Sequence, residues 1–263
     1  MVSAVATNDT AIDSFATFTG SLADLTRPVI DRFFRQPLSI ESKGDGSPVT
    51  VADRTVEEML RTAIRERFPD HGLLGEEYGV EELDRRHVWV IDPIDGTKSF
   101  VTGLPLFGTL IALLEDRRPV IGAIEIQPLR ERWLGIAGRG TTLNSQPCRT
   151  SGCTRIEDAV LYATTPDVFQ GTDRDSFERA SARVRLRRFG GDCYAYGLVA
   201  SGFADAVVET GLQPYDYLAL IPVIEGAGGV ITDWEGRPPS IDSDGRIVAT
   251  ATPELHRAIL DTL

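Results

Sequence analysis

Two N-terminal segments, residues 11–34 and 53–68, carry apolar residues at the spacing of an amphipathic helix. The apolar positions are Ile12, Phe15, Phe18, Leu22 and Leu25 in the first segment and Val56, Met59, Leu60 and Ile64 in the second. The pattern predicts two helices. The stretch 41–50 between them is rich in Gly, Pro and Ser, which predicts a loop whose last residue, Thr50, caps the second helix.

From residue 88 onward, short apolar runs separated by turns or charged segments predict strands. The expected strands of the first half are residues 88–91, 109–114, 120–126 and 132–136. After residue 150 the expected strands are 159–163, 184–189, 206–209, 230–232 and 247–249, and the expected helices are 173–182, 194–201, 217–226 and 253–263.

The order of these elements predicts a chain of two halves. Helices followed by strands are typical of an α+β unit, whereas alternating strands and helices are typical of an α/β unit. We therefore expect an α+β half at residues 1–149 and an α/β half at residues 150–263. No low-complexity linker separates them, so the halves are expected to share an interface.

The charge of the chain limits its partners. Its 263 residues contain 27 Lys and Arg against 39 Asp and Glu, a net charge of −12. Such a protein repels nucleic acids and anionic membranes, so neither is expected as a partner. A small phosphorylated substrate remains compatible with this net charge if a positive group, such as a metal ion, binds the phosphate.

Cysteine and histidine usage argues against a disulfide framework and a zinc site. The three cysteines form no CxxC pair, and the three histidines form no HxH or HxxxH set. The first ten residues lack a basic segment followed by an apolar run, and the longest aliphatic run, 110–114, is too short to span a bilayer. We therefore expect a cytoplasmic protein.

The strongest chemical motif follows the apolar run at residue 88. Asp92 and Asp95 stand three residues apart, with the carbonyl of Ile94 between them and with Gly96 and Thr97 directly after them. Two acids just past the end of a buried strand are costly unless a cation neutralises them. Oxygen donors without His or Cys indicate a hard cation, most simply Mg²⁺. The alternative is an ordinary acidic turn.

Further acids lie on both sides of this motif. Glu76 and Glu77 follow an apolar pair, and Asp216 stands immediately before an apolar helix, where an N-cap is the structural alternative. Two ions roughly 3.5–4 Å apart would suit in-line displacement at phosphorus, with water as the nucleophile. A nucleophilic aspartate is disfavoured, because aspartyl-phosphate enzymes of that kind place their two acids two residues apart.

Together these motifs resemble those of the inositol monophosphatase family, the Mg²⁺-dependent, lithium-sensitive phosphomonoesterases. The resemblance covers about residues 12–249. It is carried by the sequence DPIDGT at 92–97, GEE at 75–77, Asp216 and GAGG at 226–229. It implies a layered αβαβα sandwich, which combines α/β and α+β features, and a homodimer.

The resemblance also implies a metal site that holds two or three Mg²⁺ ions. The first ion would be held by Glu76, Asp92 and the backbone carbonyl of Ile94, and the second by Asp92, Asp95 and Asp216. A third, weaker ion would lie near Asp53.

The same resemblance implies roles around the phosphate. Asp53 and Thr97, together with the ligand Glu76, would position or deprotonate the attacking water. The backbone of Gly96 and Thr97 would hold the phosphate, and Lys43 would lie on a loop that closes over the site.

Within the family, the segments 190–196 and 209–220 are most similar to the histidinol-phosphatase branch, and Tyr215 stands where most relatives have Trp. Histidinol phosphate carries an ammonium and an imidazole, which Asp192 and Glu209 could pair with. Arg188 and Lys98 are candidates for phosphate contact, with a solvated strand end as the alternative for Arg188. Other candidate functions are hydrolysis of an inositol monophosphate or a nucleoside bisphosphate, and a catalytically silent binding protein.

Overall fold

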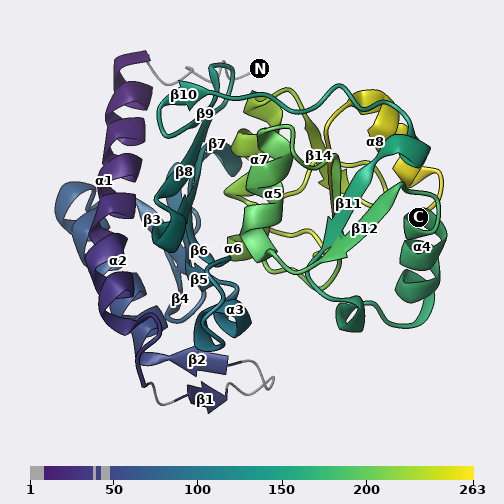
Figure 1. Ribbon diagram of the computed structural model, residues 1–263. Helices are drawn as coiled ribbons and strands as arrows, with labels where there is room; N and C mark the ends of the chain where they lie inside the picture. The colour runs from purple at the N-terminus through teal and green to yellow at the C-terminus, as the bar shows by residue number, and fades with distance from the viewer. Residues whose placement is uncertain (1–8, 38–39, 43–47) are drawn as a thin grey trace.

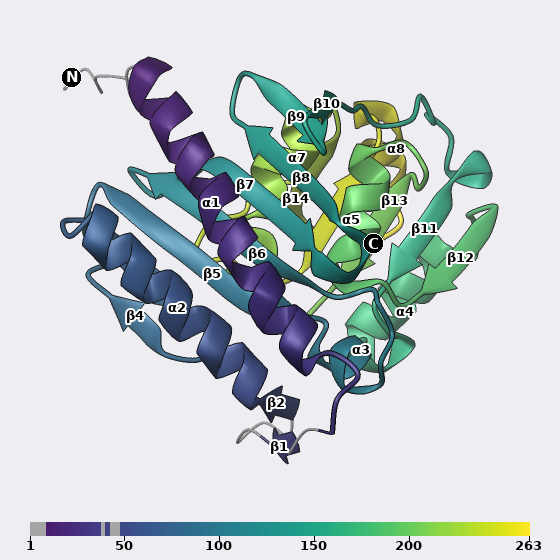
Figure 2. The ribbon, with the colours of Figure 1, turned by 60° about the vertical axis from the view of Figure 1, so that its left-hand side comes forward.

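The structure, a computed structural model, describes residues 9–37, 40–42 and 48–263, and it is built of five layers (Figure 1). The outer helices on one side are α1 (Asp9–Phe33) and α2 (Val51–Arg67), which run across one face of an eight-stranded sheet (Figure 2). The middle helices α5 (Asp192–Ala200) and α7 (Leu220–Gly226) separate that sheet from a five-stranded one. Helices α4 (Gly171–Ser181) and α8 (Pro253–Leu260) cover the far side. The predicted αβαβα sandwich is confirmed.

The larger sheet has the strand order β10-β9-β8-β7-β6-β5-β3-β4, and all neighbouring pairs except β3 and β5 are antiparallel. Its strands are β3 (Gly72–Gly75), β4 (Gly79–Glu81), β5 (His87–Asp95), β6 (Gly108–Glu115), β7 (Arg118–Ile126), β8 (Glu131–Ile136), β9 (Gly140–Leu143) and β10 (Gln146–Pro147). The expectation that Asp92 and Asp95 lie past the end of the strand is wrong, because β5 continues through both. The register against β6 shifts between them, so this end of β5 is irregular.

The smaller sheet has the order β12-β11-β13-β15-β14. Its strands are β11 (Val160–Ala163), β12 (Leu186–Phe189), β13 (Ala206–Glu209), β14 (Val230–Asp233) and β15 (Ile247–Thr250). Strand β11 runs parallel to β12 and β13, whereas β15 is antiparallel to β13 and β14. Each strand predicted after residue 150 is therefore present, with small differences at the ends.

Several short elements differ from the prediction. The expected loop 41–50 contains an antiparallel pair, β1 (Ile40–Ser42) and β2 (Pro48–Thr50), although Thr50 does cap α2. The helix expected at 217–226 is divided into α6 (Pro214–Tyr217) and α7, because Pro222 has no N–H to continue the hydrogen-bond ladder. Elements without a sequence prediction include α3 (Thr97–Val101) and the 3₁₀ helices η1 (Gln127–Leu129), η2 (Ile156–Asp158) and η3 (Pro166–Val168).

The two sheets pack against the same middle helices. The largest buried cluster joins residues of β6, β7 and β8 to residues of α5, α7 and β13. Contact is closest at Gly122 of β7, where an added Cβ would lie 1.9 Å from the carbonyl oxygen of Ala219. The expected interface between the halves is thus present, while the boundary near residue 150 stays a prediction.

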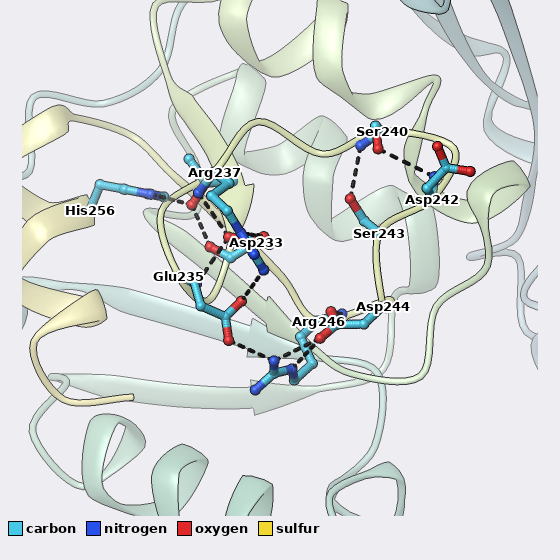
Figure 3. A network of polar contacts seen from close by, with 10 residues as sticks. Asp233, Glu235, Arg237, Ser240, Asp242, Ser243, Asp244, Arg246 and His256 are labelled. Carbon is cyan, nitrogen blue, oxygen red and sulfur yellow. Dashed lines mark hydrogen bonds and ion pairs between the residues drawn. The ribbon is translucent and has the colours of Figure 1, made fainter.

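A loop after β14 is held by a network of polar contacts (Figure 3). The Asp233 carboxylate accepts hydrogen bonds from the backbone N–H groups of Glu235 and Arg237 at 3.0 and 2.8 Å, and it also pairs with the Arg237 side chain. Arg246 pairs with Glu235 and Asp244. The acids of this loop therefore have cationic or backbone partners of their own.

Trp234 lies in the turn directly after the edge strand β14, where it is buried and stacks on Phe169. Among the described residues, no helix has the length and apolar character needed to cross a membrane.

Candidate active site

Three carboxylates that are distant in the sequence meet at one point between the layers. Asp92 and Asp95 come from β5 and Asp216 from α6, and their carboxylate oxygens lie within 4.8 Å of one another. Asp92 is only 2% exposed. The convergence that the sequence motifs predicted is therefore present in the fold.

The irregular end of β5 orients the first two carboxylates. Asp92 Oδ1 accepts a hydrogen bond from the Ile94 N–H at 3.0 Å, and Asp95 Oδ2 accepts one from the Cys193 N–H at 2.5 Å. Gly96 follows with φ 86°, and a Cβ there would lie 2.7 Å from Asp192 Oδ2. Only glycine combines this backbone conformation with so close an approach.

Asp216 is fixed by the first turn of α6. Its Oδ2 accepts a hydrogen bond from the Gln213 N–H at 2.7 Å, and the two residues form a capping box. The alternative that Asp216 itself is the N-cap is therefore wrong, because Gln213 takes that position. The loop of Figure 3 supports this turn, since the Tyr217 hydroxyl donates to the Ser240 carbonyl at 2.6 Å.

Glu76 and Asp53 lie beside the cluster. The Glu76 charge acts on the carboxyl groups of both Asp92 and Asp53. The turn that carries Glu76 is held by buried Glu57 of α2, whose carboxylate accepts from the Glu77 N–H at 2.7 Å and the Tyr78 N–H at 3.2 Å. One helix, α2, thus positions two of the predicted site residues.

Asp53 also has a structural partner. Its Oδ2 accepts from the N–H and the hydroxyl of Thr50, at 2.8 and 2.6 Å, in the capping box of α2. Burial raises the pKa of Asp53, while the Thr50 hydrogen bonds lower it. This carboxyl therefore combines a capping contact with a position next to Glu76.

The electrostatics of the cluster fit a hard divalent cation. Burial raises the pKa of Asp92 and Asp95 well above the usual range, and neighbouring negative charges raise it further. For Asp92 these charges come from Glu76, Asp95 and Asp216. A cation would offset both effects, and the donors are carboxylate oxygens, the ligands that Mg²⁺ prefers.

A second group of polar side chains lines a cavity shared with Asp95 and Asp216. Asp192, at the start of α5, accepts from the Ser99 hydroxyl at 2.8 Å. Glu209, at the end of β13, is 3% exposed and accepts from the Thr164 N–H at 2.6 Å. Burial raises the pKa of Glu209 to about 8. Acidic groups therefore face this cavity from two directions.

The other predicted site residues lie around this centre. Thr97 begins α3 and donates its hydroxyl to the Ile94 carbonyl at 3.1 Å. Lys98 is exposed, and its charge acts on Asp192. Arg188 is exposed on the edge strand β12 and does not line the cavity. Lys43 lies outside the described residues.

The sequence analysis did not identify Tyr196, Ser99 or Thr164 as site residues. Tyr196 stands four residues after Asp192 on α5, and this spacing, which places both side chains on one helix face, could have indicated it. Thr164 contributes through its backbone, for which the side-chain type gives no signal.

Comparison with known proteins identifies the family of the chain. Residues 12–263 match the model of the inositol monophosphatase family. The chain is 44% identical to a protein of Arabidopsis thaliana named bifunctional phosphatase IMPL2, chloroplastic, over 97% of this chain and 77% of the relative. It is 37% identical to a histidinol-phosphatase of Chlorobaculum parvum, over 84% of this chain and 85% of the relative.

A solved structure has the same fold. The inositol monophosphatase from Zymomonas mobilis superposes with a TM-score of 0.89 and 40% identity, covering 96% of this chain and 98% of that one. The range matched by the family model, residues 12–263, includes Asp92, Asp95 and Asp216. The chain belongs to the inositol monophosphatase family.

Proposed function

We propose that the protein is a Mg²⁺-dependent phosphomonoesterase that hydrolyses L-histidinol phosphate to L-histidinol and phosphate, a step of histidine biosynthesis. Membership of a phosphatase family supports hydrolysis of a phosphomonoester. The choice of substrate rests on one observation. Asp192 and Glu209 line the same cavity as Asp95 and Asp216, two of the proposed metal ligands. The cavity has a volume of about 20 Å³, so its acidic lining would suit a small cationic group of the substrate, such as an ammonium.

The proposed metal ligands are those that converge in the fold. Glu76, Asp92 and the carbonyl of Ile94 would hold one ion, and Asp92, Asp95 and Asp216 a second. When bound, Mg²⁺ supplies positive charge that offsets the charge of the carboxylates and the phosphate and makes a water molecule more acidic. A third ion near Asp53 is part of the same proposal.

The remaining residues would position the reactants. Asp53 and the Thr97 hydroxyl, together with Glu76, would orient the attacking water and accept its proton. The N–H groups of Gly96 and Thr97 would bind the phosphate, and Lys98 is exposed close enough to contribute charge. Arg188 would contribute only if its side chain turned toward the substrate from β12.

The amino and imidazole groups of histidinol phosphate would pair with Asp192 and Glu209. A neighbouring ammonium favours the charged carboxylate and so opposes the burial that raises the pKa of Glu209. The relative named histidinol-phosphatase supports this assignment.

A second candidate is an inositol monophosphatase, favoured by the likeness to the enzyme of Zymomonas mobilis. An inositol ring offers hydroxyl groups, which Asp192 and Glu209 could also accept hydrogen bonds from. It offers no cation to offset two acids, so we place it second.

Phosphate release separates these functions. Histidinol phosphate, myo-inositol monophosphate and a nucleoside bisphosphate are compared at equal concentration, each with Mg²⁺ and with chelator. We expect the highest kcat/KM for histidinol phosphate and no turnover in chelator. A higher kcat/KM for the inositol ester would assign the second function, and Mg²⁺ binding without any phosphate release would indicate a silent binding protein.

A further inference from the structure

One polar group in the acidic cavity has no assigned role. Tyr196 lies one helical turn beyond Asp192 on α5 and is 3% exposed. Its side chain lines the cavity together with Asp95, Glu209 and Asp216, and the charges of those three groups act on its hydroxyl. The ring belongs to the buried cluster between the two sheets. The hydroxyl is therefore carried by a well-packed ring to the acidic side of the cavity.

This hydroxyl has no hydrogen-bond partner among the described residues. A buried hydroxyl without a partner costs free energy, so native structures rarely keep one without a reason. The tyrosine of α6 shows the usual situation, since the Tyr217 hydroxyl donates to the Ser240 carbonyl at 2.6 Å. The cavity that Tyr196 lines has a volume of about 20 Å³, so the missing partner can be a small donor group of a ligand bound at its mouth.

The chemistry of the cavity defines that partner. Ionised carboxylates only accept hydrogen bonds, whereas a phenol hydroxyl both donates and accepts. The Tyr196 hydroxyl, which is not hydrogen-bonded to any described residue, can accept from an N–H or O–H of a ligand. An ammonium carries three N–H donors, so two carboxylates and one phenol oxygen would satisfy it.

We infer that Tyr196 is a specificity-determining residue whose hydroxyl accepts a hydrogen bond from a donor group on the non-phosphate half of the substrate. This inference rests on the proposed function, in which that donor is the ammonium of histidinol phosphate. The phosphate and the metal ligands need no contribution from Tyr196, so a substrate without the donor group gains nothing from its hydroxyl.

The test is Tyr196→Phe, which removes the hydroxyl and keeps the ring. It is assayed on histidinol phosphate and on the same ester without its amino group. We expect kcat/KM for histidinol phosphate to fall about tenfold, mainly through KM, as for one lost hydrogen bond to a charged group, and kcat/KM for the deaminated ester to change less than about twofold. An equal loss on both esters, or no loss on histidinol phosphate, would overturn the inference.

Tyr194→Phe is the matched control. Tyr194 lies on the same helix but packs on Trp133 and does not line the cavity. We expect this variant to have the wild-type kcat/KM for both esters. A loss of kcat/KM confined to histidinol phosphate in this variant would overturn the inference.

Thermal unfolding without substrate separates a structural role from a ligand role. Because the Tyr196 hydroxyl has no partner in the described part of the chain, Tyr196→Phe should keep or raise the melting temperature. A clear fall would show a structural hydrogen bond and overturn the inference.

The substrate proposal can fail independently. If the wild type does not hydrolyse histidinol phosphate but hydrolyses the inositol ester, the proposed substrate is wrong. Tyr196 is then judged on the inositol ester against phenyl phosphate. A loss confined to the inositol ester upholds the inference, and an equal loss on both overturns it.

Discussion

At the scale of single residues, the main feature is the concentration of acids in a small buried space. Asp92 and Asp95 repel each other and their neighbours, and burial adds to the cost of ionising them. Backbone N–H groups fix both carboxylates in place, so the repulsion is not relieved by rotation. A divalent cation bound between these carboxylates would offset both the repulsion and the cost of burial.

Asp95→Asn tests this account of the cluster. The amide keeps an oxygen that can accept from the Cys193 N–H but removes one negative ligand. We expect kcat/KM to fall at least about 100-fold, while the melting temperature in chelator stays equal or rises because like charges are fewer. Phosphate release and thermal unfolding measure the two effects, and full activity would reject Asp95 as a ligand.

The raised pKa of Glu209 predicts a pH-dependent stability. In the folded protein this carboxyl keeps its proton up to about pH 8, whereas in the unfolded chain it releases it near the ordinary value of 4.5. The folded state therefore binds more protons in this window, and the free energy of unfolding falls as the pH rises, by up to about 1.4 kcal/mol per pH unit.

His71 and His256, with pKa values lowered to about 4, act in the opposite direction, but only below the ordinary histidine pKa of 6.5. The histidines therefore do not contribute between about pH 6.5 and 8, where the raised pKa values of Asp92 and Asp95 act in the same direction as that of Glu209, so the contribution of Glu209 is the difference between wild type and variant. Denaturant unfolding in chelator should show a smaller slope for Glu209→Gln than for the wild type in this window. Identical slopes would show that Glu209 does not hold a proton there.

Glu209→Gln also tests substrate recognition. The amide cannot pair with a cation, so we expect KM for histidinol phosphate to rise about tenfold or more and KM for phenyl phosphate to change little. Steady-state kinetics on both esters measure this. Equal changes in KM would remove Glu209 from the recognition of the non-phosphate half.

At the scale of elements, α2 supports the site through residues spaced four apart. Asp53, Glu57 and Arg61 share one helix face, and all three are buried. Glu57 pairs with Arg61 at 2.8 Å and holds the turn that presents Glu76. The position of α2 therefore determines the position of Glu76, a proposed metal ligand.

Glu57→Gln should weaken this support. It removes one of the two carboxylates that pair with the buried Arg61, the other being Glu81 at 2.9 Å, so the cost stays below the roughly 3–5 kcal/mol of a fully unpaired buried charge, and it loosens the Glu76 turn. We expect a lower free energy of unfolding and a higher Mg²⁺ concentration for half-maximal activity. Glu58→Gln, at the exposed neighbouring position, is the control. Unchanged Mg²⁺ dependence in Glu57→Gln would limit Glu57 to a structural role.

The elements also show what the sequence could and could not predict. Helical periodicity located α1 and α2, and apolar runs located β5 to β8, because these patterns arise from burial of one face. Strand β3 was missed because Gly72–Gly75 is too short to show a period. The D-P-I-D-G-T motif predicted a metal site because its ligands are close in sequence. The four-residue spacing places Tyr196 on the same helix face as Asp192, but that this face lines the cavity depends on how α5 docks between the sheets.

At the scale of the whole molecule, the site lies where elements of both halves meet. Strand β5 of the larger sheet, the start of α5, the end of β13 and the turn α6 all contribute residues. Their relative positions depend on close contact between β7 and the segment that joins α6 to α7. Stability of this interface and activity are therefore expected to change together.

Gly122→Ala tests this dependence. Its Cβ would collide with the backbone carbonyl of Ala219, which cannot move away by changing a rotamer. We expect a loss of about 2–3 kcal/mol in the free energy of unfolding and a reduced kcat, because Ala219 lies three residues after Asp216. Gly152→Ala, where an added Cβ meets no atom within 4 Å, is the control. Wild-type stability in Gly122→Ala would contradict this packing.

The most direct test of the central claim is anomalous diffraction from a crystal soaked in Mn²⁺, a substitute for Mg²⁺ with a strong anomalous signal. We predict a peak in contact with the carboxylate oxygens of Asp92, Asp95 and Asp216, and loss of that peak in Asp95→Asn. Crystals that release phosphate but show no ion at these three residues would contradict the account.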